Sequence, residues 1–132
     1  MKLALARSAA VLALALAATA LAQSRAELDV QRTSGTLDRG ASLAAMRDTG
    51  NAVQRCLLLA RDTQLTPGPR AFRVEVAANG APTVTDAAAS PPANPTETAV
   101  RACMRRAIGR VQFPANADGA SVLTVTVRLV GG

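Results

Sequence analysis

The apolar segment at the start of the chain limits the fold most, because it decides how much of the sequence can belong to a domain. Lys2 and Arg7 give a positive start, residues 9–18 are all apolar, and residues 20–22 read Ala-Leu-Ala. These three features in this order are typical of a secretory signal peptide. We therefore expect residues 1–22 to be removed on export, which leaves 110 of the 132 residues to fold.

An uncleaved membrane anchor is the alternative interpretation of this segment. The stretch from Ser8 to Ser24 has 17 residues and includes Thr, Ser and Gln. A spanning helix needs about 20 predominantly apolar residues, so the stretch is short for that purpose. The sequence favours cleavage but does not distinguish a cleaved signal from a retained anchor.

The composition of the chain argues against catalysis. It contains no His, Trp or Tyr and only two Phe. Without His it lacks the usual general base near neutral pH and the commonest metal ligand, and two Cys cannot complete a zinc site alone. Two aromatic residues are too few for a platform that stacks nucleic-acid bases. We therefore expect no enzyme, no cofactor, no metal and no nucleic-acid partner.

The only two cysteines, Cys56 and Cys103, are expected to form a disulfide in an exported protein. Disulfides persist in oxidising compartments, whereas in the cytosol the pair would be buried thiols or a redox pair. No C-x-x-C motif is present. Closing a loop of about 48 residues would stabilise the fold by about 4 kcal/mol on the chain-entropy estimate.

Apolar residues at spacings of three and four predict two helices. Residues 41–61 carry the first such pattern, with a break expected near Gly50 because glycine weakens a helix. The second helix is expected over residues 94–110, since Asn94 can cap it and Glu97 follows three residues later. Its expected apolar side consists of Val100, Cys103, Met104, Ala107 and Ile108.

Alternation of apolar and polar residues predicts three strands. Residues 71–76 form the first, and Asn79-Gly80 then predicts a type I′ hairpin turn into a return strand at residues 82–85. The clearest alternation covers residues 121–130. The order helix, strand, strand, helix, strand suits an α+β fold, in which two helices pack on one face of a three-stranded antiparallel sheet.

These elements place one domain over residues 41–132. Residues 23–40 are polar and lack a sustained period. We expect them to form a flexible lead-in that contains at most a short strand near residues 33–37.

Several segments together resemble a known family, the AgmX/PglI type of TonB C-terminal-like domain. The segments that carry the similarity are residues 53–56, 72–76, 79–80, 99–103 and 111–114. The resemblance covers residues 43–129, and the two helix cysteines with the Phe-Pro after the second helix are its most specific parts. It implies a protein-binding module that adds an extended partner segment to its sheet. Since residues 23–40 lack the proline of an energy transducer's spacer, a periplasmic or secreted relative is expected.

On this resemblance, Ser121–Val130 is the candidate edge strand for partner binding. Its expected contact residues are Ser121, Thr124, Thr126 and Arg128. The expected partners are envelope proteins, including those of the outer membrane. An edge that is covered, or paired in a homodimer, is the alternative, so monomer and homodimer both stay open.

The second helix also carries a group of basic residues. Its members are Arg101, Arg105, Arg106 and Arg110, in a chain whose formal charge of +6 falls to +4 without the first 22 residues. A solvated helix face is the simpler interpretation of such a run. The functional alternative is a basic envelope-associated structural protein that binds an anionic surface, either lipopolysaccharide or an acidic protein.

Overall fold

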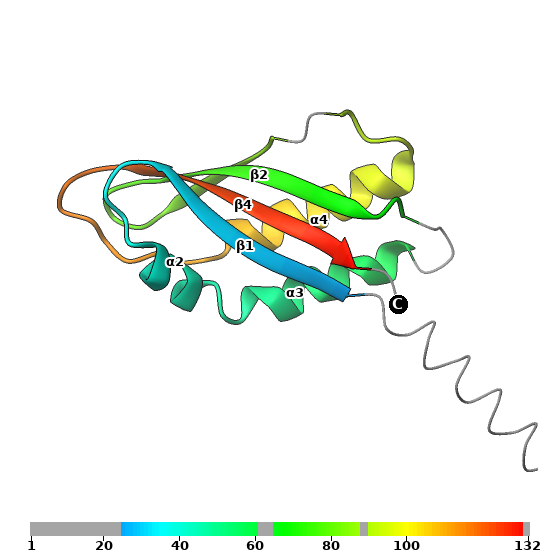
Figure 1. Ribbon diagram of the computed structural model, residues 1–132, viewed down its shortest axis with the longest axis horizontal. Helices are drawn as coiled ribbons and strands as arrows, with labels where there is room; N and C mark the ends of the chain where they lie inside the picture. The colour runs from blue at the N-terminus through cyan, green and yellow to red at the C-terminus, as the bar shows by residue number, and fades with distance from the viewer. Residues whose placement is uncertain (1–24, 61–64, 88–89, 131–132) are drawn as a thin grey trace, which may run out of the picture.

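The computed structural model describes residues 25–60, 65–87 and 90–130, which form a four-stranded antiparallel sheet with helices on one face (Figure 1). The elements in chain order are β1 (Arg25–Ser34), α2 (Arg39–Ala45), α3 (Thr49–Cys56), the 3-10 helix η1 (Leu57–Ala60), β2 (Gly68–Val76), β3 (Pro82–Asp86), α4 (Pro95–Gly109) and β4 (Ser121–Val130). The strands lie in the order β1-β4-β2-β3. The α+β class is confirmed, but the expected three strands and the expected element order were wrong. The signal-peptide prediction falls outside the described residues.

The additional strand is β1, which lies where a flexible lead-in was expected. It pairs antiparallel with β4, from Arg25 opposite Val130 to Ser34 opposite Val122, with one irregularity near its end. Ala26, Leu28 and Val30 face the helices, yet only Val30 is fully buried. The sequence does alternate between polar and apolar residues from Arg25 to Gln31, and the interpretation of this segment as a flexible lead-in missed that strand signal.

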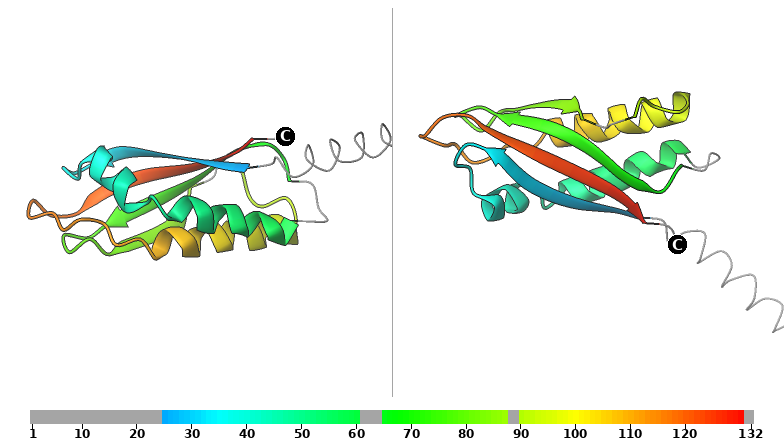
Figure 2. Two further views of the ribbon diagram at one scale, coloured as in Figure 1. Left: turned by 90° about the horizontal axis from the view of Figure 1, so that it is seen from below. Right: turned by 45° about the horizontal axis from the view of Figure 1, so that its top comes forward.

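The core lies between the sheet and the pair of helices α3 and α4, which run side by side on one face (Figure 2). Inward residues of all four strands meet Val53 of α3 and Val100 and Met104 of α4. The strand residues with no exposed surface are Val30, Phe72, Val74, Leu123, Val125 and Val127. No described helix covers the other face of the sheet, which carries the polar half of each alternation.

The first predicted helix is divided into three short pieces. Asp38 caps α2, since its Oδ2 accepts the N–H of Ala41 at 2.8 Å. The chain turns between Ala45 and Thr49, so the expected break comes before Gly50, which lies inside α3. The second helix agrees with its prediction, because Asn94 Oδ1 accepts the N–H of Glu97 at 2.8 Å.

The β2–β3 hairpin has a different turn from the one predicted. Gly80 has a φ of 88° and donates its N–H to the carbonyl of Ala77 at 2.8 Å. Among the described residues only glycines have positive φ, so Asn79 does not, as a type I′ turn would require. The loop is therefore a type I turn followed by a left-handed glycine.

Gly80 also packs against the segment that follows α4. Phe113 donates its N–H to Gly80 O at 3.1 Å, and a Cβ on Gly80 would lie 2.0 Å from Phe113 O. Two of the segments that carry the family resemblance, around Asn79-Gly80 and Phe113, are thus in direct contact. Their co-occurrence has a structural reason.

Replacing Gly80 with alanine is expected to lower the free energy of unfolding by at least about 2 kcal/mol, because backbone strain adds to a clash with a carbonyl. Gly119→Ala is a matched control, since Gly119 also has positive φ but an added Cβ would meet nothing within 4 Å. Urea denaturation of the two variants separates the clash from the strain. Equal losses would show that the contact with Phe113 contributes nothing.

Candidate functional site

The predicted disulfide is present and joins the two helices that cover the sheet. Cys56 is the last residue of α3, and its sulfur bonds to that of Cys103 in α4, with the Cα atoms 5.7 Å apart. This separation lies within the usual range for disulfides. The bond holds the α3 end against α4, next to η1.

The predicted partner-binding edge is not an edge. β4 pairs with β1 on one side and with β2 on the other, so that Thr126 lies between Asp29 and Ala71. Ser121 is buried and its Oγ accepts the N–H of Leu37 at 3.1 Å. The prediction was wrong because β1 was not expected, and without β1 the last strand would have been outermost.

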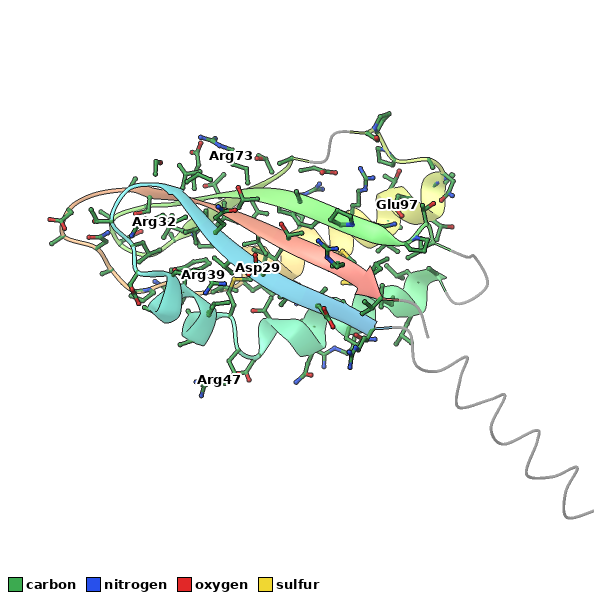
Figure 3. All side chains as sticks on the ribbon, in the orientation of Figure 1. Asp29, Arg32, Arg39, Arg47, Arg73 and Glu97 are labelled. Carbon is green, nitrogen blue, oxygen red and sulfur yellow. A yellow bond between two sulfur atoms is a disulfide. The ribbon has the colours of Figure 1, made fainter. Side chains whose placement is uncertain are left out.

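Thr124, Thr126 and Arg128 instead lie on the open face of the sheet, by the alternation of β4. This face carries balanced charges, namely Arg25, Arg73 and Arg128 with Glu27, Asp29 and Glu75. Most of these groups form ion pairs, Arg25 with Glu27 and Arg73 with Glu75, while Asp29 pairs with Arg39 of α2 (Figure 3). The open face therefore offers no net charge to attract a charged partner.

The actual edges are β1 and β3, and β1 is already partly occupied. Gln54 Oε1 of α3 accepts the N–H of Ala26 at 2.8 Å, and Arg39 Nε of α2 donates to Val30 O at 2.8 Å. Side chains that occupy the backbone groups of an edge strand prevent another strand from pairing there. β1 is thus protected at two of its outward positions.

The edge formed by β3 is open at its centre. Val84 lies opposite Val74 in the β2–β3 ladder. The ladder's hydrogen-bonded pairs include Ala77 with Ala81 and Ala71 with Ala87, and counting from either places Val84 in a non-hydrogen-bonded pair. By the alternation of an antiparallel ladder, the N–H and C=O of Val84 point away from β2. No hydrogen bond to either group is found within the described part of the chain. Pro82 precedes it, and its missing N–H is tolerated because that position also points outward.

A cluster of four charged side chains lies between β2, β3 and the start of α4, and two of them, Arg70 and Glu97, are buried. Arg70 donates from Nε and Nη2 to the two carboxylate oxygens of Glu97, both at 3.0 Å, and each side chain is 6% exposed. Arg101 donates to Glu97 Oε1 at 2.8 Å and to Asp86 Oδ2 at 3.4 Å. Two guanidinium groups therefore face two carboxylates, and the cluster has no net charge.

The protonation of Glu97 is set by this cluster. The hydrogen bonds from Arg70 lower the pKa of Glu97, burial opposes this by raising it, and Arg101 lowers the pKa further. The net effect is a lowered pKa, so the carboxylate is ionised at neutral pH.

A cavity of about 510 Å³ lies beside the cluster, and Glu97 and Arg101 form part of its wall with residues 65–71 and 90–91. In the described part of the chain, every buried side-chain nitrogen and oxygen has a hydrogen-bond partner. The charged groups of the wall therefore satisfy one another and leave no unpaired group for a ligand. We interpret the cluster as a structural connection between sheet and helix.

The four arginines expected to form one basic face are divided by the structure. Arg101 pairs with Glu97 in the charged cluster and Arg105 is half-buried, whereas Arg106 and Arg110 are exposed. Arg105, Arg106 and Arg110 form no ion pair with another described residue, whereas Arg101 forms two. Glu97 lies four residues before Arg101, and this spacing favours an ion pair along a helix. The spacing could have shown from the sequence that Arg101 pairs with Glu97 and does not join the exposed arginines.

Two further properties concern the described residues alone. No group of three or more His, Cys, Asp or Glu among them is placed to hold a metal ion. None of their helices has the length and apolar character needed to span a bilayer.

No protein-family model, curated protein or solved structure matches the chain. Membership of the TonB C-terminal-like group therefore stays a prediction that rests on the residues themselves.

Proposed function

We propose that the protein is an exported binding module of the cell envelope, which captures an extended segment of a partner protein by adding it to β3. The observation that carries the proposal is the open outer edge of β3, where Val84 presents its N–H and C=O away from the sheet. Edge strands with such groups are templates for strand addition. The disulfide between Cys56 and Cys103 supports an oxidising, extracytoplasmic compartment, in agreement with the signal-like start of the sequence.

The proposed partner segment would lie along residues 82–86 and bond to Val84 through its own backbone. Thr83 and Thr85 lie on the open face of the sheet beside this position. Backbone bonds would supply affinity, and contacts with side chains such as these threonines would supply specificity. β1 is the less suitable edge because Gln54 and Arg39 already occupy two of its backbone groups.

Replacing Val84 with proline should reduce partner capture at least about tenfold, because it removes an outward N–H without removing a bond to β2. Val84→Ala is the matched control, since it shortens the side chain but keeps the N–H. A photo-crosslinker placed at Thr85 of the exported protein, followed by mass spectrometry, would measure capture in cells. The edge would be excluded as the binding site if the proline variant kept the same crosslinked partner as the alanine variant.

Proline at Thr126 is not a suitable test of strand addition. Thr126 lies in the central strand and is flanked by paired strands on both sides. Proline there removes a ladder hydrogen bond in either orientation, so loss of binding would only report unfolding.

Contact between an anionic surface and the helix layer is a second candidate function. The observation in its favour is that Arg106 and Arg110 are exposed and form no ion pair with another described residue. Such binding would weaken sharply as the Debye length shrinks from about 30 Å at 0.01 M salt to about 3 Å at 1 M. Strand addition should largely survive that change, so a salt titration of binding distinguishes the two candidates.

A further inference from the structure

Two neighbouring leucines on η1 face solvent instead of the core. Leu58 is 60% exposed and Leu59 is 53% exposed, and no other large hydrophobic residue of the described chain is exposed. Leu57 and Ala60, on the same short helix, pack against the core. η1 therefore presents an apolar ridge that the fold itself does not use.

The ridge continues the outward side of α3. Arg55 is exposed and lies three residues before Leu58 and four before Leu59, so the three side chains share one side of the helical segment. A basic residue followed by two leucines gives this side a mixed basic and apolar character, which is common in segments that lie on membrane surfaces.

The start of the described chain lies at the same end of the molecule. The N–H of Ala26 is bonded to Gln54, the neighbour of Arg55, and Arg25 is opposite Val130 at the end of β4 (Figure 1). Arg25 is exposed, and its pairing with Glu27 at 3.3 Å is a surface pairing of little strength. A second arginine thus lies at the same end of the molecule as the leucines, on the open-face side of β1.

This location fixes where residues 1–24 join the fold. In the sequence, that stretch contains the apolar run of residues 9–18. If the run is retained as an anchor, it attaches at the end that carries Leu58 and Leu59. If it is cleaved after Ala22, the new amino group belongs to Gln23, two residues before Arg25, and adds positive charge to the same end.

We propose that this end of the domain seats on an anionic lipid surface. Leu58 and Leu59 enter the headgroup region, while Arg25 and Arg55 bind lipid phosphates through charge-assisted hydrogen bonds. The contact is reversible, since two leucines and two arginines provide only a small membrane-binding surface. It uses neither β3 nor the exposed arginines of α4, so it is independent of strand addition.

The absence of Trp and Tyr from the chain permits a direct test. Leu58→Trp and Leu59→Trp would each place a single fluorescent reporter on the ridge of the exported protein. With vesicles of phosphatidylglycerol, we expect the emission to shift to shorter wavelength and brominated lipid to quench it. Ala117→Trp is the control, because the loop between α4 and β4 lies at the opposite end of the molecule (Figure 1) and should show neither effect.

Charge variants in the Leu58→Trp background complete the test. Arg25→Gln with Arg55→Gln should weaken vesicle binding about tenfold or more, as each arginine near an anionic surface contributes measurably. Arg106→Gln with Arg110→Gln removes the same charge elsewhere and should have a clearly smaller effect. The proposal is overturned if neither reporter shifts, if the Arg106 and Arg110 pair has the larger effect, or if the shift appears without vesicles as protein concentration rises, which would indicate a second copy. None of these outcomes bears on β3, because no partner protein is present.

Discussion

Glu97→Gln is expected to lower the free energy of unfolding by about 3–5 kcal/mol at neutral pH, the range for breaking one partner of a buried ion pair. Glu97 accepts both hydrogen bonds of a two-point contact with Arg70, and both side chains are almost fully buried. Without the carboxylate, Arg70 keeps a buried positive charge whose remaining contacts are the carbonyls of Thr66 and Gly68. Urea denaturation provides the measurement.

Glu75→Gln is the matched control for this variant. Like Glu97, Glu75 pairs with an arginine of β2, in this case Arg73, but both of these side chains are about half exposed. Exposed ion pairs typically contribute about 1 kcal/mol or less, so this variant should remain close to the parent. A Glu97 variant no less stable than the Glu75 variant would contradict the proposed structural role of the cluster.

The same cluster predicts the direction of a pH effect. The pKa of Glu97 is lower in the folded state than its ordinary value of 4.5 in the unfolded chain. Its contribution to stability is therefore complete above that value and is lost as the pH falls below it, towards the folded-state pKa. The parent should lose stability over this acidic range more steeply than Glu97→Gln. Parallel pH profiles for the two proteins would contradict this assignment.

The parts of the fold that the sequence predicted are those in which local pattern and burial agree. Phe72, Val74 and Val76 alternate with charged residues, and all three are buried in the sheet. The α4 helix has a capping asparagine, a proline at its start and a continuous apolar side. In these segments the apolar residues follow the local period and are also the buried ones, so periodicity was sufficient.

The failures lie where a residue's purpose depends on a distant segment. β1 contributes only Val30 to the fully buried core, and its pairing with β4 joins residues that are 88 (Ser34 and Val122) to 105 (Arg25 and Val130) positions apart. Missing this strand placed β4 at an edge and misassigned Thr124 and Thr126. The alternation of residues 25–31 could have indicated the strand itself, but no local pattern shows that this strand pairs with β4.

Arg70 illustrates a signal that was present but could not be completed. Alternation through Phe72 and Val74 places Arg70 on the inward side of β2, where an arginine requires a buried partner. That partner, Glu97, lies 27 residues away on α4 and already had a satisfactory local role in the first turn of the helix. From the sequence alone, Glu97 is assigned only its role at the start of α4, and its pairing with Arg70 is missed.

Removal of the disulfide, by Cys56→Ala together with Cys103→Ala, is expected to lower the free energy of unfolding by about 4 kcal/mol. The bond joins positions 47 residues apart, so the unfolded chain loses much conformational freedom when it is closed. The native packing should change little, because Val53, Val100 and Met104 still bury their side chains between the two helices and the sheet. Domains of this size have a net stability of about 5–15 kcal/mol, so the loss is a large share of the total.

The origin of this loss can be tested separately from its size. If the bond acts mainly on the unfolded chain, the double variant should unfold at lower urea concentration while β2 and β4 keep the parent's pattern of hydrogen exchange under native conditions. Reducing the parent protein with a thiol should produce the same midpoint as the double variant, which controls for the two lost sulfur atoms. A loss below about 1 kcal/mol would show that the packing of α3 against α4 already restricts the chain, and that the bond adds little to it.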